Sequence, residues 1–216
     1  GYPFLRHSLM AIEVTPHVPP PVGLEEGKLT TRGDVESPAL QSSISKFNAG
    51  EHHESFTALS DVTEPDAQAA KAIVQLHLAG RLEIETEAEL TRSALVTLKD
   101  YLADNPQEHG VAELVRDTES FVKGLETHLN RGRMQEINGE LVQRNHFIEN
   151  DKAFAYLWLI KPESPLYDKA RRYAGQSAHM LMPYVPTLNT AKEIFEELEE
   201  EYPDNRYVRF FLDYEW

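Results

Sequence analysis

The feature that most limits the fold of this chain is a helical periodicity that begins near Ser37 and continues towards the end of the sequence. Apolar residues recur three or four positions apart, between short stops of glycine, proline or asparagine. Ser37 fits the N-cap of the first helix, Pro38 fits its first turn, and Gly50 follows its last turn. Helices joined by short connections usually pack as antiparallel neighbours. We therefore predict an all-α domain of eight to ten helices over residues 38–216.

Each predicted helix carries an apolar stripe on one side, as expected for helices that share a core. The stripes are Ala69, Ile73, Leu76 and Gly80 in residues 64–81; Leu90, Ala94, Leu98 and Tyr101 in residues 83–106; and Leu114, Phe121, Leu125 and Leu129 in residues 110–132. Residues 133–160 are predicted to form two helices or one kinked helix, which Pro162 ends. The pair Ser164-Pro165 repeats the Ser-Pro start of the first helix.

Residues 1–37 differ in composition from the rest of the chain, because they hold five of the thirteen prolines. Proline lacks a backbone donor and fixes φ, so the run at residues 19–21 cannot be helical. We predict an extended Pro-rich arm with a short strand at residues 9–14. Two interpretations stay open: the arm lies on the helical body as a strand or strap, or it is exchanged with a neighbouring subunit.

Charge and composition exclude several classes of partner and site. The formal net charge of -15 disfavours nucleic acid and anionic membrane surfaces as partners. The absence of cysteine excludes disulfides, cysteine zinc sites and a thiol nucleophile. No apolar run approaches the roughly 20 residues of a membrane span. The chain begins at Gly1 without an initiator Met, and we favour a cleaved signal peptide, hence a secreted or periplasmic protein.

Two helix pairs show a recurring arrangement, in residues 39–62 and 167–205. In the second pair, a small residue lies early in the second helix and the stop at residues 202–204, Tyr-Pro-Asp, closes the unit. This arrangement resembles tetratricopeptide repeats, although the Trp-Leu-Gly-Tyr positions of a regular repeat are not visible. The resemblance implies an array of antiparallel helical hairpins. An irregular helical bundle is the alternative.

A second resemblance involves residues 162–216, which look like the helical region that precedes the catalytic part of some large secreted heparinase-like polysaccharide lyases. The segment contains no diagnostic catalytic motif. The resemblance implies that this chain is the N-terminal helical portion of a lyase acting on uronic-acid polymers. Within the segment, Arg172, Gln176 and His179 share one helical face, and Tyr184 follows.

In a lyase, Arg172 would neutralise the substrate carboxylate, while His179 or Tyr184 would move the proton. The alternative is structural: His179 is packed in the core and Arg172 extends to water. Aromatic residues are concentrated in the last third of the chain, where they suit a sugar-binding groove or an interface. The candidate binding residues are Trp158, Tyr173, Phe210, Phe211, Tyr214 and Trp216.

No metal site and no cofactor are predicted. His52 and His53 are adjacent and point about 100° apart on a helix, and His146 with Glu149 supplies only two ligands. Phosphate-binding and nucleophile motifs are missing from the sequence.

Two functions stay open. One is a non-catalytic helical interaction or scaffold module that binds a protein partner, a following domain or a neighbouring subunit at the aromatic C-terminal end. The other is the lyase portion, with a glycan as its partner.

Overall fold

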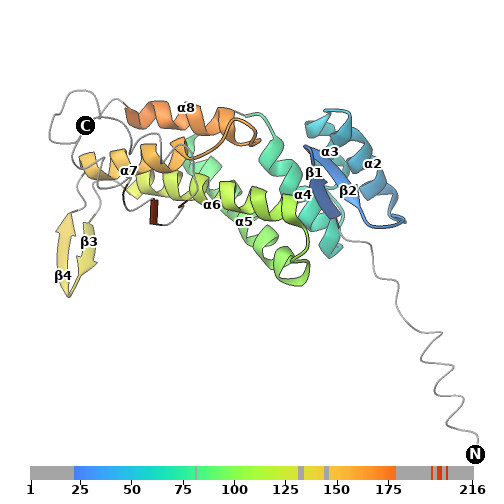
Figure 1. Ribbon diagram of the computed structural model, residues 1–216, viewed down its shortest axis with the longest axis horizontal. Helices are drawn as coiled ribbons and strands as arrows, with labels where there is room; N and C mark the ends of the chain where they lie inside the picture. The colour runs from blue at the N-terminus through green and yellow to red at the C-terminus, as the bar shows by residue number, and fades with distance from the viewer. Residues whose placement is uncertain are drawn as a thin grey trace, which may run out of the picture.

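The computed structural model describes residues 22–80, 82–130, 134–143 and 146–178, together with the single positions 196, 199, 200 and 203. Within these residues the chain is mostly helical, as predicted, and it also contains two β-hairpins (Figure 1). The helices are α2 Pro38–Asn48, α3 His52–Ala58, α4 Pro65–His77, α5 Ile84–Asp104, α6 His109–Asn130, α7 His146–Trp158 and α8 Tyr167–Ala178. The strands are β1 Val22–Glu25, β2 Lys28–Thr31, β3 Met134–Ile137 and β4 Glu140–Gln143.

Each helix from α2 to α8 packs against the next one along the chain, and α6 also contacts α8 and β1. The molecule is elongated: α2, α3 and the β1–β2 hairpin lie towards one end, and the β3–β4 hairpin projects at the other end (Figure 1). The core between the helices contains the fully buried side chains of Leu98, Phe121, Leu125, Leu157 and Tyr173. Packing between consecutive helices follows from their short connections. A repeat of tetratricopeptide type stays a prediction.

The predicted start of the first helix is confirmed. The Ser37 side chain accepts a hydrogen bond from the Leu40 N–H at 3.3 Å, and Pro38 is the first residue of α2. This bond satisfies one of the backbone donors that a helix leaves free at its N-terminus. After the last turn, Gly50 takes a φ of 84°, a conformation that glycine adopts without strain.

Residues 22–31 lie within the segment predicted as an extended arm, but they form an antiparallel β-hairpin packed on the helical body. Glu26 and Gly27 have φ values of 49° and 76°, as a two-residue type I′ turn requires. Val22 and Leu29 are buried in the main core. The arm's predicted strand at residues 9–14 lies outside the described residues.

On each outer edge of this hairpin, one strand position is hydrogen-bonded by a side chain from a helix. Tyr101 Oη accepts from the Val22 N–H at 2.6 Å and donates to the Val22 carbonyl at 2.7 Å. Asn48 Oδ1 accepts from the Leu29 N–H at 2.8 Å, and Asn48 Nδ2 donates to the Leu29 carbonyl at 3.0 Å. In the observed register, Val22 and Leu29 occupy positions whose backbone groups point away from the partner strand. Tyr101 and Asn48 therefore take the place of missing neighbouring strands.

The prediction of helix throughout residues 133–160 is wrong. The structure has the β3–β4 hairpin at residues 134–143, and α7 begins only at His146. Asn138 and Gly139, with φ values of 52° and 82°, form a type I′ turn between the strands. The Asn-Gly pair is the strongest short-range signal for such a hairpin, and it outweighs the helical spacing of the surrounding apolar residues.

The predicted stripe of α5 needs one correction. Ala94, Leu98 and Tyr101 are buried, but Leu90 is 39% exposed. Two steps of four residues rotate a helical position by roughly 80°, so Leu90 lies at the edge of the face centred on Leu98. Ile84, which is buried, extends the correct face towards the start of the helix.

Candidate functional site

Two of the predicted site residues, Arg172 and Tyr173, hold the connection between α4 and α5. Arg172 donates from its guanidinium to the Gly80 carbonyl at 2.5 Å, and the Tyr173 hydroxyl donates to the Leu82 carbonyl at 2.7 Å. Tyr173 is buried, and its ring meets the Phe121 ring edge-on with 6.2 Å between centroids. Burial, with the nearby Glu87 charge, raises the pKa of Tyr173. Tyr173 is thus packed in the core, and Arg172 bonds to a backbone carbonyl instead of extending to water. A role of either side chain in binding or catalysis stays a prediction.

Trp158 lies at the end of α7 and contacts side chains of α7 and α8. Its ring stacks on Phe154 with 5.1 Å between centroids, and the Arg171 guanidinium lies 3.5 Å from its ring centroid. Arg171 also lies 4.8 Å from the centroid of the Tyr167 ring. Cation–π contacts of this kind stabilise the packing of two helices. Sugar stacking on Trp158 stays a prediction.

The remaining predicted residues cannot be compared with the structure. His179, Tyr184, Phe210, Phe211, Tyr214 and Trp216 all lie outside the described residues. The proposed Arg172–His179–Tyr184 set is thus represented by Arg172 alone, and the lyase hypothesis stays a prediction.

A buried ion pair joins α5 to α8 and was not predicted. Lys169 Nζ lies 2.9 Å from Glu87 Oε1, and the two side chains are 9% and 5% exposed. Thr91 Oγ1 lies 3.4 Å from the same carboxylate oxygen. Each charge is compensated by the other, so the pair positions α8 on α5 and does not present a reactive group.

A cavity of about 850 Å³ lies between the β1–β2 turn, the first turns of α6, the end of α4 and the α7–α8 connection. We name it the α6 cleft. Its ionisable lining residues are Glu26, His77, Glu113, Asp117, Lys161 and Glu163. Leu24, Leu114 and Pro165 supply apolar lining. The cleft therefore combines apolar surface with several carboxylates.

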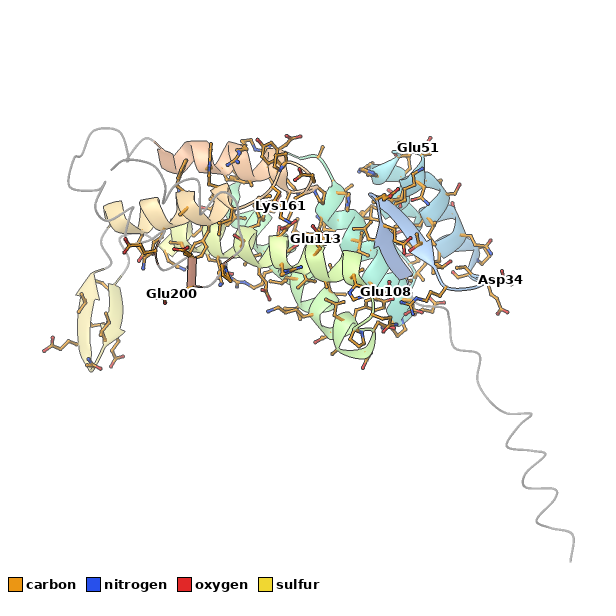
Figure 2. All side chains as sticks on the ribbon, in the orientation of Figure 1. Asp34, Glu51, Glu108, Glu113, Lys161 and Glu200 are labelled. Atoms are coloured by element: carbon orange, nitrogen blue, oxygen red, sulfur yellow. The ribbon has the colours of Figure 1, made fainter. Side chains whose placement is uncertain are left out.

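Two polar contacts join the walls of the α6 cleft. Lys161 Nζ, on the α7–α8 connection, lies 3.3 Å from Glu113 Oε1 on α6. Figure 2 labels both residues on their neighbouring elements. Asp117 forms a side-chain hydrogen bond with Ser164. Burial raises the pKa of Asp117, while this bond and the Lys161 charge oppose the rise.

His77 contributes an uncharged imidazole to the α6 cleft. Burial lowers its pKa to about 4, and the backbone hydrogen bond with Ile73 only partly opposes this shift. His77 Nδ1 lies 2.8 Å from the Ile73 carbonyl oxygen, which can only accept a hydrogen bond. Nδ1 therefore carries the proton of the neutral ring, and Nε2 is an acceptor.

The other candidate site is the surface of the β3–β4 hairpin. Met134, Ile137, Leu141 and Val142 are 58%, 46%, 71% and 42% exposed, respectively. In the described part of the chain, β3 and β4 pair only with each other. Among the described residues, no strand pairs with either outer edge of this hairpin, whereas Tyr101 and Asn48 bond to the outer edges of the β1–β2 hairpin.

Metal and membrane sites are not found in the described ranges. There, no group of three or more His, Asp or Glu side chains is placed to hold a metal ion. None of the described helices is long and apolar enough to cross a membrane.

Comparison of the chain with protein-family models, curated proteins and solved structures gave no match.

Sequence reasoning missed both candidate sites for different reasons. The residues of the α6 cleft come from four separate stretches between Leu24 and Pro165, and no local motif connects them. The β3–β4 hairpin did have a signal, the Asn138-Gly139 pair.

Proposed function

We propose that this chain is a non-catalytic interaction module that binds an extended segment of a partner protein along an edge of the β3–β4 hairpin. The observation that carries the proposal is the combination of two open strand edges with four exposed large apolar side chains on eight strand residues. An isolated two-stranded hairpin is at best marginally stable in water. A third strand would cover apolar surface and satisfy backbone groups at the same time.

The register indicates which backbone groups a partner strand would meet. Ile137 pairs with Glu140 next to the two-residue turn, so Glu136 and Leu141 form the next pair. In an antiparallel hairpin with such a turn, this second pair directs its N–H and C=O groups outwards. A partner strand on the β3 side would therefore bond to the N–H and C=O groups of Glu136. A partner strand on the β4 side would bond to those of Leu141. Peptides that add a strand in this way gain affinity from the backbone and specificity from alternate side chains.

The position of the hairpin fits this role. It projects from one end of the elongated body, so a partner strand can approach without meeting α5 or α6 (Figure 1). Natural proteins usually protect strand edges, because unprotected edges template further pairing. In this chain, helix side chains bond to the edges of the β1–β2 hairpin, but no described side chain does so for β3 and β4. The two hairpins therefore differ in the access that their edges give to a partner strand.

A displayed library of random twelve-residue peptides tests the proposal. Selection on the full chain should enrich peptides with alternating apolar residues, and Leu141→Lys should abolish their binding. Val96→Lys is the matched control, because Val96 is an apolar residue 54% exposed on α5. Leu141→Pro removes the outward N–H and should also abolish binding if the β4 edge is used; Glu136→Pro tests the β3 edge in the same way.

Amide hydrogen exchange supplies the second readout. Peptide binding should protect the N–H of Leu141 or Glu136, whichever edge is used. The proposal is wrong if no peptide is enriched, or if the enriched peptides bind the hairpin variants as well as they bind Val96→Lys. A mass twice that of the monomer in light scattering, abolished by Leu141→Lys, would show that the hairpin binds a second copy and would overturn the choice of partner.

A further inference from the structure

The second candidate site, the α6 cleft, has walls that the fold holds in place. An added Cβ at Gly110 would lie 1.7 Å from the Leu24 carbonyl oxygen, so β1 rests directly on the first turn of α6. The Lys161–Glu113 ion pair and the Asp117–Ser164 hydrogen bond join α6 to the α7–α8 connection. The cavity is therefore bounded by packed elements, and its volume of about 850 Å³ lies in the range of organic ligand pockets.

The polar lining of the α6 cleft is dominated by hydrogen-bond acceptors. The carboxyl groups of Glu26, Glu113, Asp117 and Glu163 line the cleft together with one ammonium group, that of Lys161, and the Arg116 charge also acts on Asp117. Lys161 already pairs with Glu113. His77 adds an acceptor nitrogen and no positive charge at neutral pH, since burial lowers its pKa to about 4. A ligand that fits this lining must supply donors and positive charge.

The arrangement of these groups favours an organic cation over a metal ion. A metal ion needs several ligands that converge on one point, and the described residues place no such group of three. The carboxyl groups are instead distributed around a cavity that also has apolar lining from Leu24, Leu114 and Pro165. An alkyl chain can pack on such a surface while its charged end reaches a carboxylate.

We infer that the α6 cleft is a binding site for an alkylammonium group with an aliphatic stem. Two sources carry this chemistry: a lysine side chain of a protein segment, and a free diamine. In either case the stem contacts Leu24, Leu114 and Pro165, and the ammonium group binds Glu26 and Glu113. The inference is independent of the β3–β4 hairpin, which projects at one end of the molecule, whereas Lys161 and Glu113 lie near its middle (Figures 1 and 2).

Calorimetric titration of the full chain tests the inference with three probes. These are a short peptide with two lysines, the same peptide with both lysines acetylated, and 1,5-diaminopentane. The lysine peptide or the diamine should bind, and binding should weaken at high salt because the contacts are ionic. The acetylated peptide keeps the stem without the charge and should not bind. Binding of the diamine would identify a free amine as a sufficient ligand, whereas binding of the peptide alone would identify a protein segment.

Two double variants distinguish binding by the cleft carboxylates from general attraction of a cation to the negatively charged chain. Glu26→Gln with Glu113→Gln removes two charges from the cleft and should weaken binding about tenfold or more. Asp34→Asn with Glu51→Gln removes two charges from exposed positions elsewhere, both labelled in Figure 2, and should leave affinity nearly unchanged. All four positions are exposed, so both double variants should fold.

Three results would overturn the inference: no binding by either amine probe, equal binding of the acetylated peptide, or equal weakening by the two double variants. None of these results bears on the peptide selection at the β3–β4 hairpin. The experiments can therefore disprove amine binding in the α6 cleft without disproving peptide binding at the β3–β4 hairpin, and the reverse.

Discussion

Tyr101 and Val22 are 79 residues apart in the sequence and exchange two hydrogen bonds through one hydroxyl group. The Tyr101 hydroxyl accepts from the Val22 N–H and donates to its carbonyl, so both outward backbone groups of this strand position are satisfied. Val22 is fully buried, and water cannot replace the tyrosine there. This contact attaches the β1–β2 hairpin to α5 and thereby fixes one wall of the α6 cleft.

Tyr101→Phe should therefore destabilise the protein although it removes a single oxygen atom. The variant leaves a buried N–H and a buried C=O without partners, and we expect a loss of about 2–3 kcal/mol in the free energy of unfolding. Urea denaturation measures this loss. Tyr167→Phe is the control, because the Tyr167 ring contacts Arg171 through its face and should change stability by less than about 0.5 kcal/mol. Equal effects of the two variants would contradict the role given to Tyr101.

The Glu87–Lys169 pair predicts a non-additive pattern of stability. Lys169→Met leaves the Glu87 carboxylate buried without compensation and should cost about 3–5 kcal/mol. The double variant with Glu87→Leu removes both charges and should be more stable than Lys169→Met alone. The exposed pair Arg92–Glu126 is the control, where Arg92→Met should cost less than about 1 kcal/mol. A double variant as unstable as the sum of its single variants would show that the two charges do not interact.

The partly buried imidazole of His77 predicts a pH dependence of stability between about pH 4 and pH 6.5. The pKa of His77 is lowered from 6.5 to about 4, so in this range the unfolded chain binds more protons than the folded chain. Stability should be complete above pH 6.5 and should fall by up to about 3 kcal/mol as the pH decreases through this window. The free energy of unfolding should be measured across this pH range for the wild type and for His77→Gln. The decrease that His77 causes should be present in the wild type and missing from His77→Gln. His53, which is exposed, is the control position, and His53→Gln should keep the slope.

Local chemistry was readable from the sequence where it involved neighbouring residues. Ser37 and Pro38 specify a helix start by themselves, and the structure confirms them. Leu90 was misplaced because four-residue steps drift around a helix, so a stripe must be followed over its whole length. The Asn138-Gly139 turn was missed because a helical spacing of apolar residues was given more weight than turn chemistry.

The candidate sites were less accessible because they depend on tertiary contacts. Glu87 and Lys169 are 82 residues apart, and neither position carries a motif that indicates its partner. The walls of the α6 cleft meet only after the β1–β2 hairpin has packed on α6, an event with no sequence signature. Arg172 likewise bonds to the Gly80 carbonyl, 92 residues away in the sequence, and no motif indicates this contact.

Gly110 allows the β1–β2 hairpin to approach α6. Its substitution by alanine tests this contact, because the two explanations predict opposite signs for the change in stability. Helix propensity alone predicts that Gly110→Ala stabilises α6 by up to about 1 kcal/mol. The structure predicts the opposite, because the new Cβ would lie 1.7 Å from the Leu24 carbonyl oxygen, a backbone atom that cannot move without displacing β1. We expect a loss of about 2 kcal/mol or more in urea denaturation, as for other overpacked sites.

Hydrogen exchange should locate this loss at the β1–β2 hairpin, where the amides of Val22 and Leu29 should lose protection as Tyr101 and Asn48 lose their partners. Gly80→Ala is the matched control, because its new Cβ would meet nothing closer than Leu82 at 3.9 Å. That variant should be neutral or slightly stabilising, since alanine restricts the unfolded chain. A stabilised Gly110→Ala variant with full amide protection would mean that β1 does not rest on α6, and the α6 cleft would then lack one of its walls.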